Sequence, residues 1–228
     1  MRMKKHYCII VAQFALVACS CQRIVTSEAD APAPVMAIDE DFQRYGEELM
    51  QNKEGALLAV DPSTGAILAS VFRADRADSL RVIALAEKCL SAVVRNDAPE
   101  EVDGMWRDVN GAPGTGSRLW VAHVDGLDVC GKSEALYGDC REGRPVFVGF
   151  APRENPRIAI LSYVKGRPLA ATFSAPVGSL MIERYLLGET TRPDMEERMM
   201  EARPLPRRTV VCGTYHWRQQ AAENRTDN

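Results

Sequence analysis

The stretch Gly55-Ala-Leu-Leu-Ala-Val-Asp-Pro-Ser-Thr-Gly-Ala-Ile-Leu-Ala-Ser-Val-Phe72 contains two short apolar runs separated by a polar turn. The runs cover residues 55–60 and 66–72, and the turn between them carries Pro, Ser, Thr and Gly, which are typical turn residues. Two apolar runs joined by a short Pro/Gly turn predict an antiparallel β-hairpin. This hairpin is the first part of a predicted sheet.

Helical patterns flank the hairpin on both sides. Residues 39–51 carry apolar side chains at helical spacing behind acids in the first turn, and residues 80–94 repeat apolar side chains along one helical face. A further helix is predicted to start at Asp97, because Pro99 and two acids follow in its first turn. The apolar positions of the segment 80–94 are Val82, Leu85, Ala86, Cys89, Leu90 and Val93. Those of the next helix, all predicted to be buried, are Val102, Met105, Trp106 and Val109.

The second half of the chain supplies three more strand candidates and two helices. The strand candidates are residues 127–133, 145–151 and 157–164. Ser174 can cap a helix that has Pro176 near its start and Gly188 just past its end, and a short helix is predicted over 193–200. The side chains predicted to pack inward from the helix after Ser174 are Val177, Leu180, Met181 and Tyr185.

The composition is that of one soluble globular domain. Of the 228 residues, 46% are apolar and 26% are charged. The formal net charge of −3 gives no support to nucleic-acid binding, which needs a concentrated basic face. We assign residues 1–18 to a lipoprotein signal peptide, 19–38 to a flexible tether, 39–202 to the domain and 203–228 to a disordered tail.

The first residues resemble the signal of a bacterial lipoprotein. A positive n-region precedes an apolar stretch that is too short to span a bilayer as a helix. The stretch ends in Leu16-Val-Ala-Cys19, which resembles the lipobox, whose Cys becomes the acylated first residue of the mature chain. We predict lipid attachment at Cys19 rather than Cys21, which has Ala18 where the lipobox needs Leu; an ordinary secretory signal with chance cysteines is the alternative. Several acyl chains would hold the protein at a membrane surface, in the cell envelope facing the periplasm or exterior.

The cysteines and histidines do not form a metal-binding pattern. No CxxC pair occurs and the His residues are scattered, so no metal site and no cofactor are predicted. Cys130 and Cys140 could form a disulfide across neighbouring strands, or Cys130 could stay buried as a free thiol. Ser117, His123 and Asp125 could be drawn as a triad, but unrelated surface residues are the preferred interpretation.

Three longer segments occur in an order that matches one known domain. The first runs from Tyr45-Gly-Glu-Glu-Leu-Met-Gln-Asn-Lys53 into the hairpin. The others are Val129-Cys-Gly-Lys-Ser133 leading into Val146-Phe-Val-Gly-Phe-Ala-Pro-Arg-Glu-Asn-Pro-Arg-Ile-Ala-Ile160, and Ala175-Pro-Val-Gly-Ser-Leu-Met-Ile-Glu-Arg-Tyr-Leu186. They resemble the transpeptidase domain of class B penicillin-binding proteins of the penicillin-binding protein 2 type. The stretch Glu101-Val-Asp-Gly-Met-Trp106 and the turn Gly114-Thr-Gly116 also resemble this family just before its Lys-Thr-Gly strand. The resemblance implies the serine β-lactamase and transpeptidase fold, which is α+β with an antiparallel five-stranded sheet and flanking helices.

The chain departs from this family where the chemistry should be. The family acylates a Ser in a Ser-x-x-Lys motif, whose Lys activates the hydroxyl, and a Ser-x-Asn motif completes the site. Here the chain passes from Phe72 almost directly to the late helices, so the helical active-site subdomain that should hold both motifs is missing. The one Ser-x-x-Lys string, Ser162 to Lys165, lies in a predicted strand, where residues three apart point to opposite faces. No catalytic residue is therefore predicted.

The third family motif is altered. Lys132-Ser133-Glu134 stands where the family has Lys-Thr-Gly. Ser keeps a hydroxyl, but Glu adds bulk and a negative charge where Gly leaves room for a substrate backbone. Lys132 and Ser133 are therefore interpreted as a remnant of a substrate-binding strand, and Glu134, on the same strand face as Lys132, is expected to hold the ammonium in an ion pair.

Two functions from different classes remain open at this point. The preferred one is a catalytically inactive envelope lipoprotein, either a binding or scaffolding module or an evolutionary remnant. Its expected contacts are the membrane, through the lipid, and peptidoglycan or proteins of cell-wall synthesis. The alternative is a peptidoglycan D,D-transpeptidase-related enzyme or β-lactam-binding protein whose missing half-site a partner supplies. The absence of a helical Ser-x-x-Lys favours the first.

Overall fold

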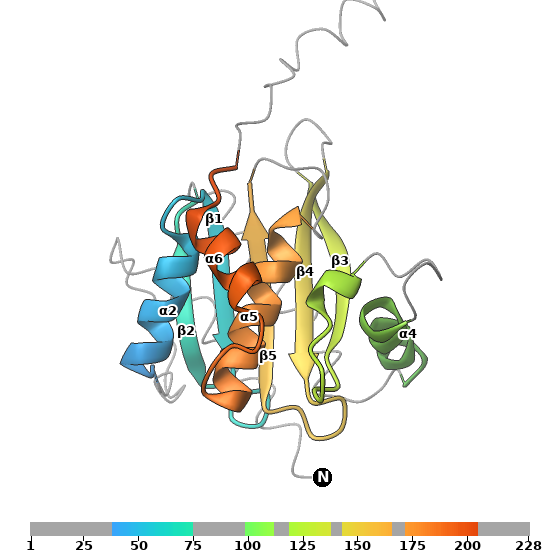
Figure 1. The fold of residues 1–228 in the computed structure, drawn as a ribbon. Coiled ribbons are helices and arrows are strands. Elements are labelled where there is room, and N and C mark those ends of the chain that lie inside the picture. The colour runs from blue at the N-terminus through green and yellow to red at the C-terminus, as the bar shows by residue number, and fades with distance from the viewer. Residues whose placement is uncertain (1–37, 75–98, 112–118, 138–142, 166–171, 205–228) are drawn as a thin grey trace, which may run out of the picture.

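The computed structural model describes residues 38–74, 99–111, 119–137, 143–165 and 172–204. These residues contain one antiparallel sheet of five strands in the order β2-β1-β5-β4-β3 (Figure 1). The strands are β1 (Gly55–Val60), β2 (Ile67–Phe72), β3 (Cys130–Tyr137), β4 (Gly143–Ala151) and β5 (Ile158–Val164). The predicted α+β class with a five-stranded antiparallel sheet is confirmed.

Four predicted segments lie outside the described residues. They are the signal peptide, nearly all of the tether, the helix expected over 80–94 and the tail beyond 204. The domain boundaries therefore stay predictions.

The β1–β2 hairpin is held by the side chain of Asp61. Its Oδ1 accepts hydrogen bonds from the Ser63 backbone N–H at 2.8 Å and the Ser63 hydroxyl at 2.7 Å, and its Oδ2 accepts from the Thr64 hydroxyl at 2.9 Å. Burial alone would raise the pKa of Asp61, but these hydrogen bonds favour the charged form more strongly, so the pKa is lowered. Gly65 completes the turn at φ 74°, a conformation that favours glycine.

Three helices cover one face of the sheet, which we call the front face. They are α2 (Glu40–Met50), α5 (Ser174–Leu187) and α6 (Pro193–Glu201), and they lie together before the sheet in Figure 1. The side chains predicted to pack inward from α5 include Val177, Leu180 and Met181, and all three are fully buried. They share one apolar cluster with strand residues such as Phe147 and Ile160.

The opposite side of the sheet, which we call the back face, has its own apolar cluster. Its strand members alternate with those of the front face and are Ala56, Leu58, Val60, Ile67, Cys130, Val146, Val148, Phe150, Ala159, Leu161 and Tyr163. Helix α4 (Pro99–Asn110) lies beside the β3 edge in Figure 1 and contributes Met105 to this cluster and Val109 to the front cluster. The helix therefore packs around an edge of the sheet rather than across a face.

Three sequence expectations need correction. Ser174 is the first residue of α5 rather than its cap, because its hydroxyl accepts a hydrogen bond from the Val164 backbone of β5 at 3.1 Å. Strand β3 starts at Cys130 rather than at 127, because a tight turn with Gly126 at φ 77° bridges Val124 and Leu127. Among the side chains predicted to be buried, Val102, Trp106 and Tyr185 are only partly so.

At Ser70, the outer edge of β2 is hydrogen-bonded by the side chain of Gln43. The Gln43 amide nitrogen of α2 donates to the Ser70 carbonyl oxygen at 3.0 Å, and the Ser70 N–H donates to Gln43 Oε1 at 2.8 Å. This pair of bonds fixes α2 against the outermost strand.

Within the described residues, every helix is too short or too polar to cross a membrane.

Candidate functional site

The residues interpreted as a binding-strand remnant lie on β3, at an edge of the sheet. Lys132 stands opposite Val148 of β4, and Glu134 stands opposite Val146, so both lie on the back-face side of β3. Ser133 is exposed and stands opposite Phe147, which belongs to the front cluster. The side chains of Lys132 and Ser133 therefore diverge, as their adjacent positions in a strand predict.

Lys132 is held between two carboxylates. Its Nζ lies 2.9 Å from Glu134 Oε1, which is the predicted ion pair, and 2.5 Å from Glu101 Oε1 of α4. The Lys132 side chain is 22% exposed, against 44% for Glu101 and 36% for Glu134. Two carboxylates around one ammonium leave a net negative charge, so a carboxylate ligand at this point would be repelled.

Glu101 is positioned by the way α4 is fixed along β3. The Asp103 carboxylate pairs with Arg153 in the loop after β4, and Trp106 Nε1 donates to Asp128 Oδ1 at 3.3 Å. At the end of the helix, Asn110 Nδ2 donates to the Val129 carbonyl at 2.7 Å. The sequence alone did not predict the ion pair of Glu101 with Lys132, because the two residues are 31 positions apart in the chain. Its place in the first turn of a predicted helix gave no sign of this contact.

The remaining Ser-x-x-Lys string does not form a nucleophile and base. Ser162 is fully buried on β5, and its hydroxyl donates to the Ser174 carbonyl oxygen. Lys165 lies at the sheet end, where its Nζ pairs with the Glu54 carboxylate. Ser162 and Lys165 therefore contact different partners, and Lys165 lies just beyond the end of β5.

His123 is fixed by a set of structural contacts. Its Nδ1 lies 2.9 Å from Asn110 Oδ1 and its Nε2 lies 3.1 Å from Asp125 Oδ1. The ring stacks on Trp120 of the short 3-10 helix η1 (Trp120–Ala122), with centroids 4.4 Å apart. Ser117, the third residue of the conceivable triad, lies outside the described residues.

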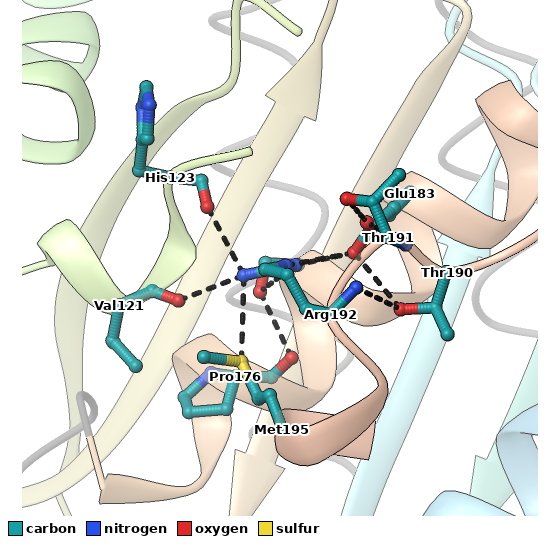
Figure 2. Close-up of polar contacts among 9 residues, drawn as sticks. Val121, His123, Pro176, Glu183, Thr190, Thr191, Arg192 and Met195 are labelled. Atoms are coloured by element: carbon teal, nitrogen blue, oxygen red, sulfur yellow. Dashed lines mark hydrogen bonds and ion pairs between the residues drawn. The ribbon is translucent and has the colours of Figure 1, made fainter. Parts of the chain in front are cut away.

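A buried ion pair that the sequence did not reveal joins α5 to the start of α6 (Figure 2). Glu183 is fully buried and Arg192 is 18% exposed, with Arg192 Nε 2.9 Å and a terminal nitrogen 2.8 Å from Glu183 Oε2. The other carboxylate oxygen, Oε1, accepts from the Thr191 backbone N–H at 2.6 Å and from the Thr191 hydroxyl.

The remaining Arg192 donors reach the segment before β3. One terminal nitrogen donates to the carbonyl oxygens of Val121 at 3.1 Å and His123 at 3.2 Å, and the other donates to Ser179 Oγ at 3.1 Å. Figure 2 shows the guanidinium at the centre of these contacts. An arginine whose five N–H donors are all used in this way connects three parts of the fold and has none left for a ligand.

Two further buried groups have shifted pKa values but no catalytic geometry. Burial lowers the pKa of Lys53 to about 8, and its Nζ donates to the Met199 carbonyl at the end of α6. Burial also raises the pKa of the Cys130 thiol to about 12, which makes it a poor nucleophile at neutral pH. Cys130 is buried and forms no disulfide, so the free-thiol interpretation is confirmed. Among the described residues, no group of three or more His, Cys, Asp and Glu could hold a metal ion.

Several solved structures match this chain, and one of them is described here. No family model and no curated protein matches the chain. The solved structure is described as the transpeptidase domain of the FtsI4 D,D-transpeptidase from Legionella pneumophila. It is 13% identical, and the match covers 67% of this chain and 97% of that one with a TM-score of 0.46.

Proposed function

We propose that this chain is a catalytically inactive, penicillin-binding-protein-like lipoprotein of the cell envelope, a binding or scaffolding module or an evolutionary remnant. The observation that carries the proposal is the placement of Lys132, whose ammonium contacts the carboxylates of Glu101 and Glu134. The resemblance in sequence and the predicted loss of the helical subdomain supply the family context.

Acylation by a β-lactam or a peptide needs three parts. It needs a nucleophilic oxygen, a base within hydrogen-bond reach and donors placed for the oxyanion. In the family that this chain resembles, the first two parts belong to the Ser-x-x-Lys helix, and one oxyanion donor is the backbone N–H of the same Ser. Losing that helix would remove the nucleophile, the base and that oxyanion donor together, which abolishes the mechanism rather than weakening it.

The lysines within the described residues support this view. Lys53 Nζ contacts a backbone carbonyl, Lys132 Nζ contacts two carboxylates and Lys165 Nζ contacts one carboxylate. The oxygens in these contacts are carbonyl and carboxylate oxygens, which carry no proton for a base to remove.

Mass spectrometry of the intact protein after incubation with excess penicillin tests the catalytic part of the proposal. We expect no covalent adduct and no D,D-carboxypeptidase turnover by the purified full chain, with an active D,D-transpeptidase as the positive control. A stoichiometric mass increase mapped to a serine would overturn the proposal. Ser133→Ala would then show whether the exposed hydroxyl on β3 is the nucleophile.

Labelling of live cells with a fluorescent penicillin tests the alternative enzyme. If a partner supplies the missing half-site, the acylated Ser belongs to that partner, so a labelled band at the partner's mass will appear in cells that make this chain and will disappear when the chain is deleted. We expect the pattern of labelled bands to be the same with and without this chain.

The membrane location is tested by the lipid-attachment residue. Cys19→Ala should release the protein from membranes or block its processing, because the acyl chains attach to that sulfur. Cys21→Ala, two residues away, is the matched control and should leave the protein at the membrane. A Cys19→Ala protein that is cleaved normally and stays on the membrane contradicts the lipoprotein assignment.

A further inference from the structure

Helix α4 ends at Asn110, and the residue that follows it is Gly111. No other Asn in the chain precedes a Gly. An Asn-Gly step is prone to deamidation, because glycine has no side chain to hinder attack of its backbone nitrogen on the Asn amide carbon. The attack forms a cyclic imide and expels ammonia, and water then opens the ring to aspartate or isoaspartate. The net reaction hydrolyses a neutral amide to a carboxylate and ammonia.

In the folded protein, the Asn110 side chain joins the end of α4 to the segments around it. Its Nδ2 donates to the carbonyl oxygen of Val129, just before β3, at 2.7 Å and to that of Trp106 in α4 at 2.9 Å. Its Oδ1 lies 2.9 Å from His123 Nδ1. Both donors of the NH2 group therefore face carbonyl oxygens, which fixes the orientation of the amide. The amide nitrogen is the atom that holds this end of α4 at the strand.

The same part of the structure holds the Asn-Gly step in an unreactive arrangement. The Gly111 N–H donates to the Arg107 carbonyl oxygen at 2.9 Å, which continues the hydrogen-bond pattern of the helix. The Gly111 nitrogen must leave this bond and lose its proton before it can attack. The Asn110 amide must also leave its three partners to present its carbon to that nitrogen. Deamidation therefore requires the last turn of α4 to open.

The other contacts of α4 are few and lie mostly near the surface. Only Met105 and Val109 of this helix are buried. Its two ion pairs, one of them between Glu101 and Lys132, join side chains that are all more than one-fifth exposed. Exposed ion pairs contribute little to stability. The hydrogen bonds of Asn110 are therefore a large part of what fixes α4 beside β3.

A carboxylate at position 110 cannot form the hydrogen bonds of the amide. One of its oxygens can still accept from His123, but the other would face the carbonyl oxygens of Val129 and Trp106 without a proton to donate. Repulsion between oxygens would then replace two hydrogen bonds. We propose that Asn110 is a deamidation site that the folded chain protects, and that its conversion releases α4 from β3 in one direction only.

This inference goes beyond the proposed function and does not depend on it. Glu101, which pairs with Lys132, belongs to the helix that would be released. Opening of α4 would therefore separate these two side chains and leave Lys132 with Glu134 of its own strand. A chemical change at one end of α4 would in this way alter the charged cluster at its other end.

Peptide mapping of the full chain after incubation at mildly alkaline pH measures conversion of Asn110 to Asp or isoaspartate. We expect the rate in native buffer to be at least about tenfold below the rate in guanidinium chloride, because the reaction requires local opening. Gly111→Ala should slow the reaction in guanidinium chloride, because its methyl group hinders the attack. Equal rates of conversion with and without the denaturant would overturn the proposal, as would an unchanged rate for Gly111→Ala.

Hydrogen exchange of two Asp variants tests the release of α4. Asn110→Asp reproduces the product, and Asn52→Asp is the matched control, since Asn52 Nδ2 also donates to a carbonyl oxygen, that of Met200 at 3.2 Å, but is exposed. In Asn110→Asp, peptides from α4 should exchange at least about tenfold faster while those from α5 keep their rates. In Asn52→Asp, α4 should be unchanged.

Two results of the exchange experiment would contradict the release. One is unchanged exchange of α4 in Asn110→Asp, and the other is an increase that α5 shares equally, which would mean general destabilisation. If Asn110→Asp fails to fold, the same measurement on partly converted protein of unaltered sequence decides between these results.

Discussion

The two main charged clusters of this protein differ in how completely their members are enclosed and paired. Glu183 and Arg192 are largely buried, and hydrogen bonds from three parts of the fold complete the pair. Lys132, Glu101 and Glu134 lie at a sheet edge and are each more than one-fifth exposed. The buried cluster holds elements together, whereas the edge cluster pairs a lysine that stays partly exposed to solvent.

The largest effect in this comparison is expected from breaking the buried pair on one side only. Glu183→Ala should lower the free energy of unfolding by about 3–5 kcal/mol, because it leaves the Arg192 charge buried without its counter-ion. The double substitution Glu183→Leu with Arg192→Met removes both charges and should cost clearly less. Chemical denaturation of the three proteins measures this, and equal losses for the single and double variants would contradict the assignment.

The packing beneath the buried pair sets the next effect. Leu180→Ala in α5 should lower the free energy of unfolding by about 2–5 kcal/mol, because Leu180 is fully buried. Leu187→Ala is the matched control, since Leu187 lies on the same helix but is 44% exposed. If Leu180→Ala melts within a degree of the unaltered protein, α5 does not seal the front face as described.

A third buried charge, Lys53, makes the comparison depend on pH. Its pKa is about 8 in the folded protein against 10.5 for the free side chain, so the unfolded chain binds more protons between these values. Stability should therefore rise as pH increases from 8 towards 10, by up to about 3 kcal/mol. The rise should be absent in Lys53→Met and retained in Lys165→Met, whose lysine is surface-paired. Denaturation curves at pH 7.5 to 9.5 would show it, and a parallel response of all three proteins would refute it.

The smallest effect is expected at the edge cluster. Glu101→Gln should change the free energy of unfolding by less than about 1 kcal/mol, because both side chains are partly exposed and Glu134 still contacts the ammonium. Thermal melts at low and high salt provide the measurement, with the difference shrinking as salt is added. A loss as large as that of Glu183→Ala would mean that the two clusters are not of different kinds.

Most of the fold could be predicted because its helices and strands follow from short-range patterns of apolar and polar residues. The apolar runs of the hairpin, the helix over Glu40–Met50 and the Gly188 helix end all depend on short-range patterns. The sequence pattern starts strand β3 too early, because Leu127 and Val129 fit a strand pattern whereas Gly126 bends the chain into a turn there. Local pattern does not show which apolar residues a turn will use.

The site was predictable only in part, for a related reason. The pairing of Lys132 with Glu134 follows from strand periodicity, since residues two apart share a face. The contacts from Glu101 to Lys132 and from Arg192 to Glu183, Val121 and His123 depend on how separate elements pack. Arg192 and Glu183 also look like ordinary surface charges in sequence, because burial of a charged residue leaves no pattern of its own.

The side-chain amide of Gln43, which lies in α2 and hydrogen-bonds to the edge strand β2, has a consequence for self-association. An edge strand exposes N–H and C=O groups that can recruit a strand from another molecule, which is the first step towards fibrils. A primary amide offers the same donor and acceptor as a peptide group, and Gln43 satisfies both groups of Ser70 at once. A second chain that adds to β2 would have to break these two bonds before forming its own. Two copies of this chain that met along β2 would thus find the backbone groups of Ser70 already hydrogen-bonded within each molecule.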